Sequence, residues 1–184
     1  MFKALCDLIF HKIMGWRIVG ADQIKSKKFI IAVAPHTSYW DFPIGILIRP
    51  LINMNAKFII KSELFKNPLV ARILTNMGGI PVDRKKKKNN LIKQVIAAYD
   101  ATDDMCIAIA PEGTRSAVKE WKKGFYYIAT GANISIVLCA FDFGKKEVNF
   151  FEEIIPTGNA EEEIEAIRKK FIGIKGKRPE LGVM

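Results

Sequence analysis

Residues 29–41 read Phe-Ile-Ile-Ala-Val-Ala-Pro-His-Thr-Ser-Tyr-Trp-Asp. The first six side chains are apolar and rich in branched residues, so they predict a buried strand over residues 29–34. A proline ends this strand, and a histidine, a serine and an aspartate follow it closely. The stretch therefore places polar side chains at the carboxyl end of a buried strand, which is the edge where open α/β sheets bind ligands.

Short apolar runs of the same kind recur along the chain and alternate with longer helical stretches. This alternation predicts an α/β fold: a single domain with a central, largely parallel or mixed β-sheet flanked by helices. The other expected strands are 57–60, 79–82, 105–110, 134–141 and 148–151. The expected helices are 42–52, 63–76, 89–101, 121–131 and 160–172. A chain of 184 residues has room for one such core.

The ends of the chain differ in character from this central part, residues 17–172. Residues 1–16 combine aromatic and aliphatic side chains with polar ones recurring every four positions, which predicts an amphipathic helix. Such a helix either packs on its own domain or lies in a membrane interface. No apolar run approaches the roughly 18 to 20 residues of a membrane-spanning helix. Residues 173–184 are rich in glycine, and we expect a loosely ordered tail there.

The chain is strongly basic, with a formal net charge of +10 and a pI near 9.5. This charge predicts an anionic partner, whether nucleic acid, a membrane surface or a phosphorylated substrate, and does not choose among them. The three cysteines, Cys6, Cys106 and Cys139, lie far apart in apolar stretches. They therefore disfavour a disulfide framework or a zinc site and favour a reducing, cytosolic setting.

His36 and Asp41 are the first candidate catalytic pair. A carboxylate that binds one imidazole nitrogen fixes the tautomer and stabilises the charged ring, which leaves the other nitrogen free to accept a proton. The pair forms such a dyad if the chain turns tightly between the two residues. In the alternative interpretation Ser38 caps a helix, Asp41 is its acidic partner, and His36 is an incidental loop residue.

Two further strand ends carry arginine beside glycine. One is Gly78-Gly79-Ile80-Pro81-Val82-Asp83-Arg84, and the other is Ala110-Pro111-Glu112-Gly113-Thr114-Arg115-Ser116. Guanidinium groups suit phosphate oxygens, and glycine lets backbone amides approach a ligand closely. Taken alone, residues 111–114 are also typical of an ordinary turn, and Asp83 and Arg84 are also typical of a surface ion pair. Three strand ends that supply a base and two anion-binding groups together predict a site built across the sheet edge.

These blocks resemble the glycerolipid acyltransferases typified by 1-acylglycerol-3-phosphate acyltransferase. The family's His-x-Ser-x-x-Asp block reads here as residues 36–41, and its second block, which ends in arginine after a strand, reads as 78–84. Its Pro-Glu-Gly-Thr-Arg-Ser block is complete at 111–116, and the lysine and glycine that usually follow are in 121–124. The blocks cover about half of the chain in the family's order.

The resemblance implies a reaction and a role for each matching residue. His36, oriented by Asp41, removes the proton from a lysolipid hydroxyl, which attacks the thioester of acyl-CoA or of acyl carrier protein directly. The implied reaction forms no acyl-enzyme and needs no metal or bound cofactor. The residues implied to bind the acceptor phosphate are Arg84, Glu112, Gly113, Thr114 and Arg115, and the supporting residues are Ser38, Lys123 and Gly124.

Several functions remain to be ranked. Acyl transfer to lysophosphatidate, giving phosphatidate, comes first; another lysophospholipid or an amino-acid lysolipid is the second acceptor, and a non-catalytic membrane-binding module comes third. A serine hydrolase is disfavoured because the chain has no Gly-x-Ser-x-Gly segment. Nucleic acid is disfavoured because aromatic residues are not interleaved with the basic ones. The lipid substrate favours a peripheral position on the cytoplasmic face of the membrane, with residues 1–16 and the basic cluster 84–88 on its anionic surface.

Overall fold

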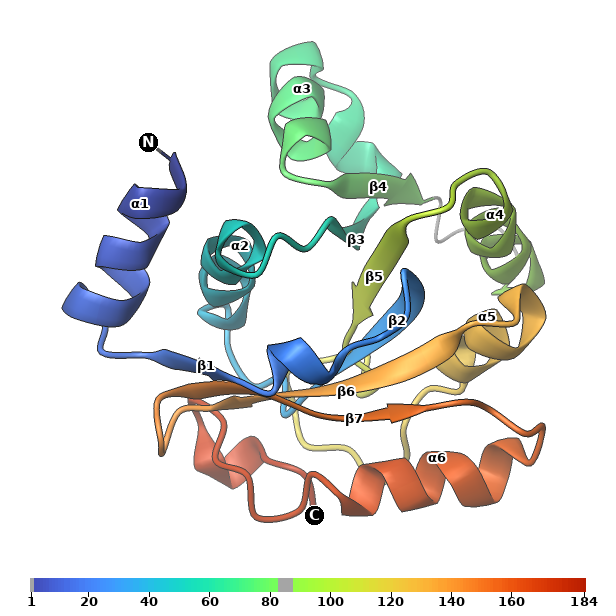
Figure 1. Cartoon of the computed structure of the whole chain (residues 1–184). Coiled ribbons are helices and arrows are strands. Elements are labelled where there is room, and N and C mark those ends of the chain that lie inside the picture. The colour runs from blue at the N-terminus through green and yellow to red at the C-terminus, as the bar shows by residue number, and fades with distance from the viewer. Residues whose placement is uncertain (1, 83–87) are drawn as a thin grey trace.

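The computed structural model describes residues 2–82 and 88–184, so Arg84 and most of the basic cluster lie outside the described residues. The described chain forms a seven-stranded sheet flanked by helices, which confirms the α/β prediction (Figure 1). The strand order is β1-β7-β6-β2-β5-β3-β4. The strands are β1 Arg17–Val19, β2 Lys28–Ala34, β3 Ala56–Lys61, β4 Gly79–Val82, β5 Met105–Ile109, β6 Ser135–Asp142 and β7 Glu147–Ile154.

Neighbouring strands of this sheet run parallel, except for β6 and β7, which pair antiparallel. The central strand β2 pairs with β5 on one side and β6 on the other. Its residues are buried on both faces, as expected for a parallel strand covered by helices from both sides. The residues that follow β2 are therefore attached to a buried strand in the middle of the sheet.

The helices form one layer on each face of the sheet. The elements η1 Leu8–Ile13 and α2 Asp41–Leu51 contribute to a core with one set of alternate β2 residues, and α1 Phe2–Asp7 contacts α2. The other set packs under α4 Lys88–Asp100, α5 Gly124–Ala132 and α6 Ala160–Lys169. Figure 1 shows α1 and α2 on one side of the sheet and α6 on the other. Two apolar cores thus sandwich the strands.

The single helix predicted over 63–76 is wrong, because the structure has two elements there. A short 3-10 helix, η3 Ser62–Phe65, precedes α3 Pro68–Asn76. Asn67 caps α3 by accepting the backbone N–H groups of Leu69 and Val70, and Pro68 occupies the first turn, where it needs no donor. None of the α3 residues is buried, and the helix stands at one end of the sheet beside β4 (Figure 1).

The N-terminal segment packs on the domain and also presents apolar side chains to solvent. Its helix continues from α1 into η1, and Cys6 and Phe10 are buried beneath it. Four large apolar side chains remain exposed on its other sides, namely Phe2, Leu5, Leu8 and Ile13. In the described part of the chain, no helix has both the length and the apolar character needed to cross a membrane.

The C-terminal segment, for which we expected loose order, makes defined contacts with the rest of the domain. The carbonyl of Lys175 accepts the backbone N–H of Phe143 at 2.8 Å. Gly176 is buried, and the backbone N–H of Arg178 donates to the hydroxyl of Thr37 at 3.1 Å. A short 3-10 helix, η4 Pro179–Leu181, follows. Residues 175–178 are therefore joined to the loop that carries the candidate dyad.

Candidate active site

The candidate site residues gather where the carboxyl ends of parallel strands meet. Strands β2, β5, β3 and β4 are consecutive neighbours with the same direction, so their carboxyl ends share one edge of the sheet. The loop with His36 leaves β2 at this edge, and residues 111–116 leave β5 beside it. Strand β3 ends there with Lys61, which pairs with Val82 at the end of β4.

His36 and Asp41 form a hydrogen-bonded pair at this edge. The distance from His36 Nδ1 to Asp41 Oδ2 is 2.7 Å, and the backbone N–H of Ser38 donates to the same oxygen at 3.3 Å. The side chain of Asp41 is 4% exposed and that of His36 is 26% exposed. Asp41 also begins α2, where the helix dipole favours a carboxylate. The acid is thus buried behind a ring whose edge meets solvent.

The contacts match the alternative role of these residues as a helix cap only in part, because the Asp41 carboxylate accepts the backbone N–H of Ser38, as in a capping box, but also accepts from the His36 ring. The start of α2 has no side-chain cap hydrogen bond. The hydroxyl of Ser38 accepts the backbone N–H of Trp40 at 3.2 Å, whereas the carboxylate of Asp41 binds His36. The tight turn between His36 and Asp41 therefore serves the imidazole.

Glu112 binds the backbone of the histidine rather than facing away from it. Its two carboxylate oxygens lie 3.0 and 3.1 Å from the backbone nitrogen of His36, which donates to them. The Glu112 side chain is buried, and burial raises its pKa from the ordinary 4.5 to about 7, while the hydrogen bond from His36 opposes this rise. Two acids thus fix His36, with Asp41 at the ring and Glu112 at the main chain.

The rest of the 111–116 segment forms a turn beside the dyad. Gly113 has a φ of 67°, a left-handed conformation that favours glycine. The hydroxyl of Thr114 accepts the backbone N–H of Ser116 at 3.4 Å. The guanidinium carbon of Arg115 lies 3.6 Å from the centre of the Tyr39 ring, in cation–π geometry. Because Tyr39 lies between His36 and Asp41 in the chain, this contact joins the two loops of the site.

A model of the family described as Acyltransferase matches residues 15–142, which is most of the chain and includes these loops. The chain belongs to the acyltransferase family. It is 26% identical over 120 residues to the probable 1-acyl-sn-glycerol-3-phosphate acyltransferase 5 of Arabidopsis thaliana. That match covers 60% of this chain and 31% of the plant protein, so the chain corresponds to about a third of that relative.

The fold of this acyltransferase is also similar to a solved structure. The crystal structure of the 1-acyl-sn-glycerophosphate (LPA) acyltransferase PlsC from Thermotoga maritima matches with a TM-score of 0.61 and 20% sequence identity. The similarity covers 92% of this chain and 74% of the Thermotoga chain. At this level of identity the likeness establishes the architecture, with its mostly parallel seven-stranded sheet.

The Lys-Gly pair predicted to support the acyltransferase site, Lys123 and Gly124, lies at the start of α5. Lys123 is exposed, and its Nζ forms an ion pair with Glu161 of α6 at 2.6 Å. Gly124 begins α5, with open space where a side chain would project. It is the preceding residue, Lys122, that meets the 111–116 loop, because its backbone N–H donates to the Pro111 carbonyl at 2.7 Å.

Sequence reasoning missed Thr37 as the residue that joins the loop of the candidate dyad to the C-terminal segment. Thr37 is 1% exposed and accepts the N–H of Arg178, while Gly176 packs against it. These contacts link positions 141 residues apart, so no local pattern reveals them. Among residues 2–82 and 88–184, no three histidine, cysteine or acidic side chains come together as a metal-binding group.

Proposed function

We propose that this acyltransferase moves a fatty acyl group from acyl-CoA or acyl carrier protein to the free hydroxyl of lysophosphatidate, giving phosphatidate. The observation that carries the proposal is the hydrogen bond between His36 Nδ1 and the buried carboxylate of Asp41. A carboxylate accepts here, so Nδ1 carries the proton and Nε2 is the basic nitrogen. The partly exposed ring offers that nitrogen to a substrate at the sheet edge.

The proposed reaction is a direct transfer. Nε2 of His36 removes the proton of the acceptor hydroxyl as its oxygen attacks the thioester carbonyl, and Asp41 stabilises the protonated ring. The tetrahedral intermediate then expels the thiolate as the carbon–sulfur bond breaks. The thiolate takes the proton from His36, so the products are a new ester and a free thiol, and the dyad returns to its starting state.

The acceptor phosphate is assigned to the loop after β5 and to Arg84. Arg115 keeps one face of its guanidinium on Tyr39, and its N–H groups at the edge suit phosphate oxygens. Gly113 and Thr114 form the adjacent turn, where backbone amides approach a ligand closely. Glu112 instead serves as a positioning residue, because its carboxylate holds the backbone of His36 and would repel a phosphate.

The lipid acceptor requires contact with a membrane, and we place the protein on its cytoplasmic face as a peripheral protein. The exposed apolar residues of α1 and η1 suit the boundary between headgroups and acyl chains. The exposed residues Leu69 and Ile73 on α3 add a second apolar surface, beside β3 and β4 of the site edge. The net charge of +10 favours anionic lipids.

A thiol-release assay tests both the reaction and the acceptor. Purified protein is given acyl-CoA with lysophosphatidate, lysophosphatidylcholine, lysophosphatidylglycerol or an amino-acid lysolipid in turn. We expect the highest kcat/KM with lysophosphatidate and a loss of at least about 10²-fold in His36→Ala. A higher value with another acceptor would reassign the substrate. Thiol release that needs no acceptor would indicate a thioester hydrolase, and no release with any acceptor would leave a non-catalytic binding module.

A further inference from the structure

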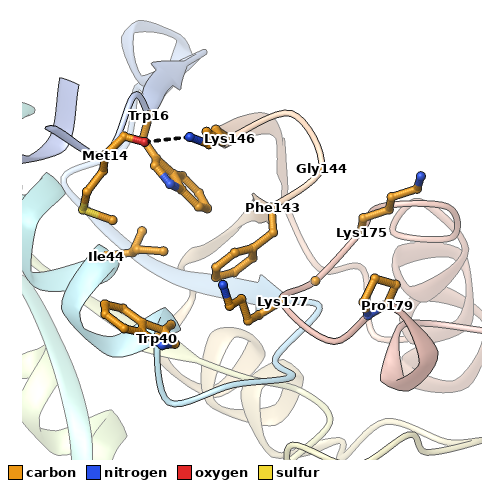
Figure 2. A pocket seen from close by; sticks show the side chains of 11 residues that line it. Met14, Trp16, Trp40, Ile44, Phe143, Gly144, Lys146, Lys175, Lys177 and Pro179 are labelled. Carbon is orange, nitrogen blue, oxygen red and sulfur yellow. Dashed lines mark hydrogen bonds between the residues drawn. The ribbon is translucent and has the colours of Figure 1, made fainter. Parts of the chain in front are cut away.

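A cavity of about 500 Å³ lies between the N-terminal segment, the start of α2, the β6–β7 turn and the C-terminal segment. Figure 2 shows Trp16, Phe143 and Trp40 around it, and the rings of Trp16 and Phe143 pack edge to face with centroids 4.9 Å apart. None of His36, Glu112 and Arg115 lines it. The cavity is therefore distinct from the dyad, although its volume falls in the range of small-molecule sites.

The charge around this cavity has one sign. Its described lining includes Lys146, Lys175 and Lys177 and no carboxylate. In the ranges 2–82 and 88–184, none of these three ammonium groups forms an ion pair with an acid of the chain. The nearby Glu147 is paired with Arg17. The three ammonium groups therefore have no ion-pair partner among the described residues, although the buried Asp142 lies near the Lys175 side chain, and an external anion would supply such a partner.

The walls of the cavity have a different character from its rim. Apolar and aromatic groups line the hollow, whereas Lys146 Nζ donates to the Met14 carbonyl at 3.1 Å and Lys177 Nζ lies 5.7 Å from the centre of the Phe143 ring. Ammonium groups above an aromatic wall suit a molecule with an anionic head and an apolar body. The exposed apolar residues of the adjoining η1, Leu8 and Ile13, would bring such a molecule to the mouth when η1 lies on a membrane.

We propose that this cavity binds the phosphate headgroup and upper acyl chains of an anionic membrane phospholipid, at a site separate from the acceptor. The proposal rests on the proposed membrane position but not on the proposed chemistry. The site adjoins the catalytic loop at two points. Trp40 directly precedes Asp41, and Gly176 packs against Thr37. A bound lipid therefore holds together the segments that flank the dyad.

Tryptophan fluorescence reports occupancy of the cavity directly. The chain has three tryptophans, of which Trp16 and Trp40 line the cavity, whereas Trp121 is buried against Phe171 in the other core. The probe is a short-chain phosphatidylglycerol with brominated chains, used below its micelle concentration so that no membrane is present. We expect saturable quenching that decreases in Trp40→Phe and persists in Trp121→Phe.

The charge of the rim is tested by Lys175→Glu/Lys177→Glu against the matched control Lys119→Glu/Lys169→Glu, whose exposed lysines lie elsewhere. The rim variant should bind the probe at least about tenfold more weakly, and the control should stay within about twofold of wild type. Equal weakening in both variants, equal binding of brominated phosphatidylcholine, or no saturable quenching would each overturn the proposal. Competition by coenzyme A alone would also overturn it, because the cavity would then serve the acyl donor.

Acyl transfer by the rim variant in detergent tests the proposed lipid site independently of the proposed acyltransferase function. The lysines of the rim take no part in the proposed chemistry, so transfer to lysophosphatidate dispersed in detergent should match wild type. Lipid binding without transfer in wild type would refute the proposed function and leave the cavity site intact. Far-UV circular dichroism and thermal midpoints of all variants show whether they fold alike.

Discussion

Asparagine in place of Asp41 removes one charge from the dyad and puts an amide NH2 group in the place of Oδ1, which is buried and has no hydrogen-bond partner among the described residues. The carboxylate accepts from His36 Nδ1 at 2.7 Å and from the backbone of Ser38 at 3.3 Å, and an asparagine oxygen accepts from both donors in the same geometry. The buried NH2 group lacks an acceptor, so the thermal midpoint of the variant has to be measured beside its kcat. In the proposed mechanism, the variant lacks the negative charge that stabilises the imidazolium ring when it takes the proton from the acceptor hydroxyl.

The expected loss of kcat in Asp41→Asn follows from the distance between the charges of Asp41 and of the protonated His36 ring. Opposite charges centred about 4 Å apart attract each other by about 4 kcal/mol at an effective dielectric constant near 20. The exposed edge of the His36 ring admits solvent, which screens this attraction to about 2 to 4 kcal/mol. Each 1.36 kcal/mol is a factor of ten in rate, so we expect kcat to fall about 30- to 10³-fold in Asp41→Asn.

Steady-state thiol release at saturating acyl-CoA and varied lysophosphatidate measures this loss. The KM for lysophosphatidate should change less than about threefold, because the lost interaction belongs to the transition state. Ser38→Ala is the matched control, since its hydroxyl accepts from Trp40 while its backbone N–H still binds Asp41. A kcat for Asp41→Asn within about threefold of wild type, with the thermal midpoint unchanged, would refute the role of Asp41.

Three further changes test the surroundings of the dyad. Arg115→Ala should raise the KM for lysophosphatidate about tenfold or more and leave the KM for acyl-CoA nearly unchanged, whereas a change confined to acyl-CoA would move Arg115 to the donor site. Glu112 has a pKa raised from 4.5 to about 7 by burial, so its contribution to stability is complete below pH 4.5 and is lost as the pH rises through 7. Urea titrations should therefore show that the free energy of unfolding of Glu112→Gln rises by up to about 3 kcal/mol relative to that of wild type between pH 4.5 and 8. A difference in unfolding free energy that does not change with pH would contradict the raised pKa of Glu112. In Gly176→Ala the new Cβ would lie 2.5 Å from the Thr37 hydroxyl, so kcat should fall several-fold, and unchanged kinetics would mean that the C-terminal segment does not position His36.

Sequence periodicity was a good guide to the fold where elements are buried on both faces. The strand predicted at 29–34 lacks only the first residue of β2, and the strand predicted at 134–141 is shifted by one residue from β6 at both ends. The partly exposed edge strand β4 also has the predicted bounds, 79–82. The three-residue β1 was missed, because such a short run has no detectable period and depends on pairing with β7. The proline at 68 was a sufficient signal for the split of the helix predicted over 63–76.

The site was predictable to the extent that its contacts are local. The approach of Asp41 to His36 spans five residues, which spacing and turn chemistry suggest. The hydrogen bond from the His36 backbone to Glu112 spans 76 residues, so the sequence identified Glu112 as a candidate site residue but did not predict its contact with His36. The supporting role of Lys123 stays a prediction, and the backbone bond from Lys122 to Pro111 was not foreseen, because side-chain type does not reveal main-chain contacts.

The most direct test of the dyad is the rate at which acylated lipid forms in a single turnover, followed by mass spectrometry of both the lipid and the intact protein. We expect wild type to convert lysophosphatidate and acyl-CoA to phosphatidate with no acylated protein at any time. His36→Ala should form phosphatidate at least about 10²-fold more slowly. An acyl group on the protein that precedes the lipid product, or a His36→Ala rate equal to wild type, would contradict direct transfer by the His36–Asp41 pair.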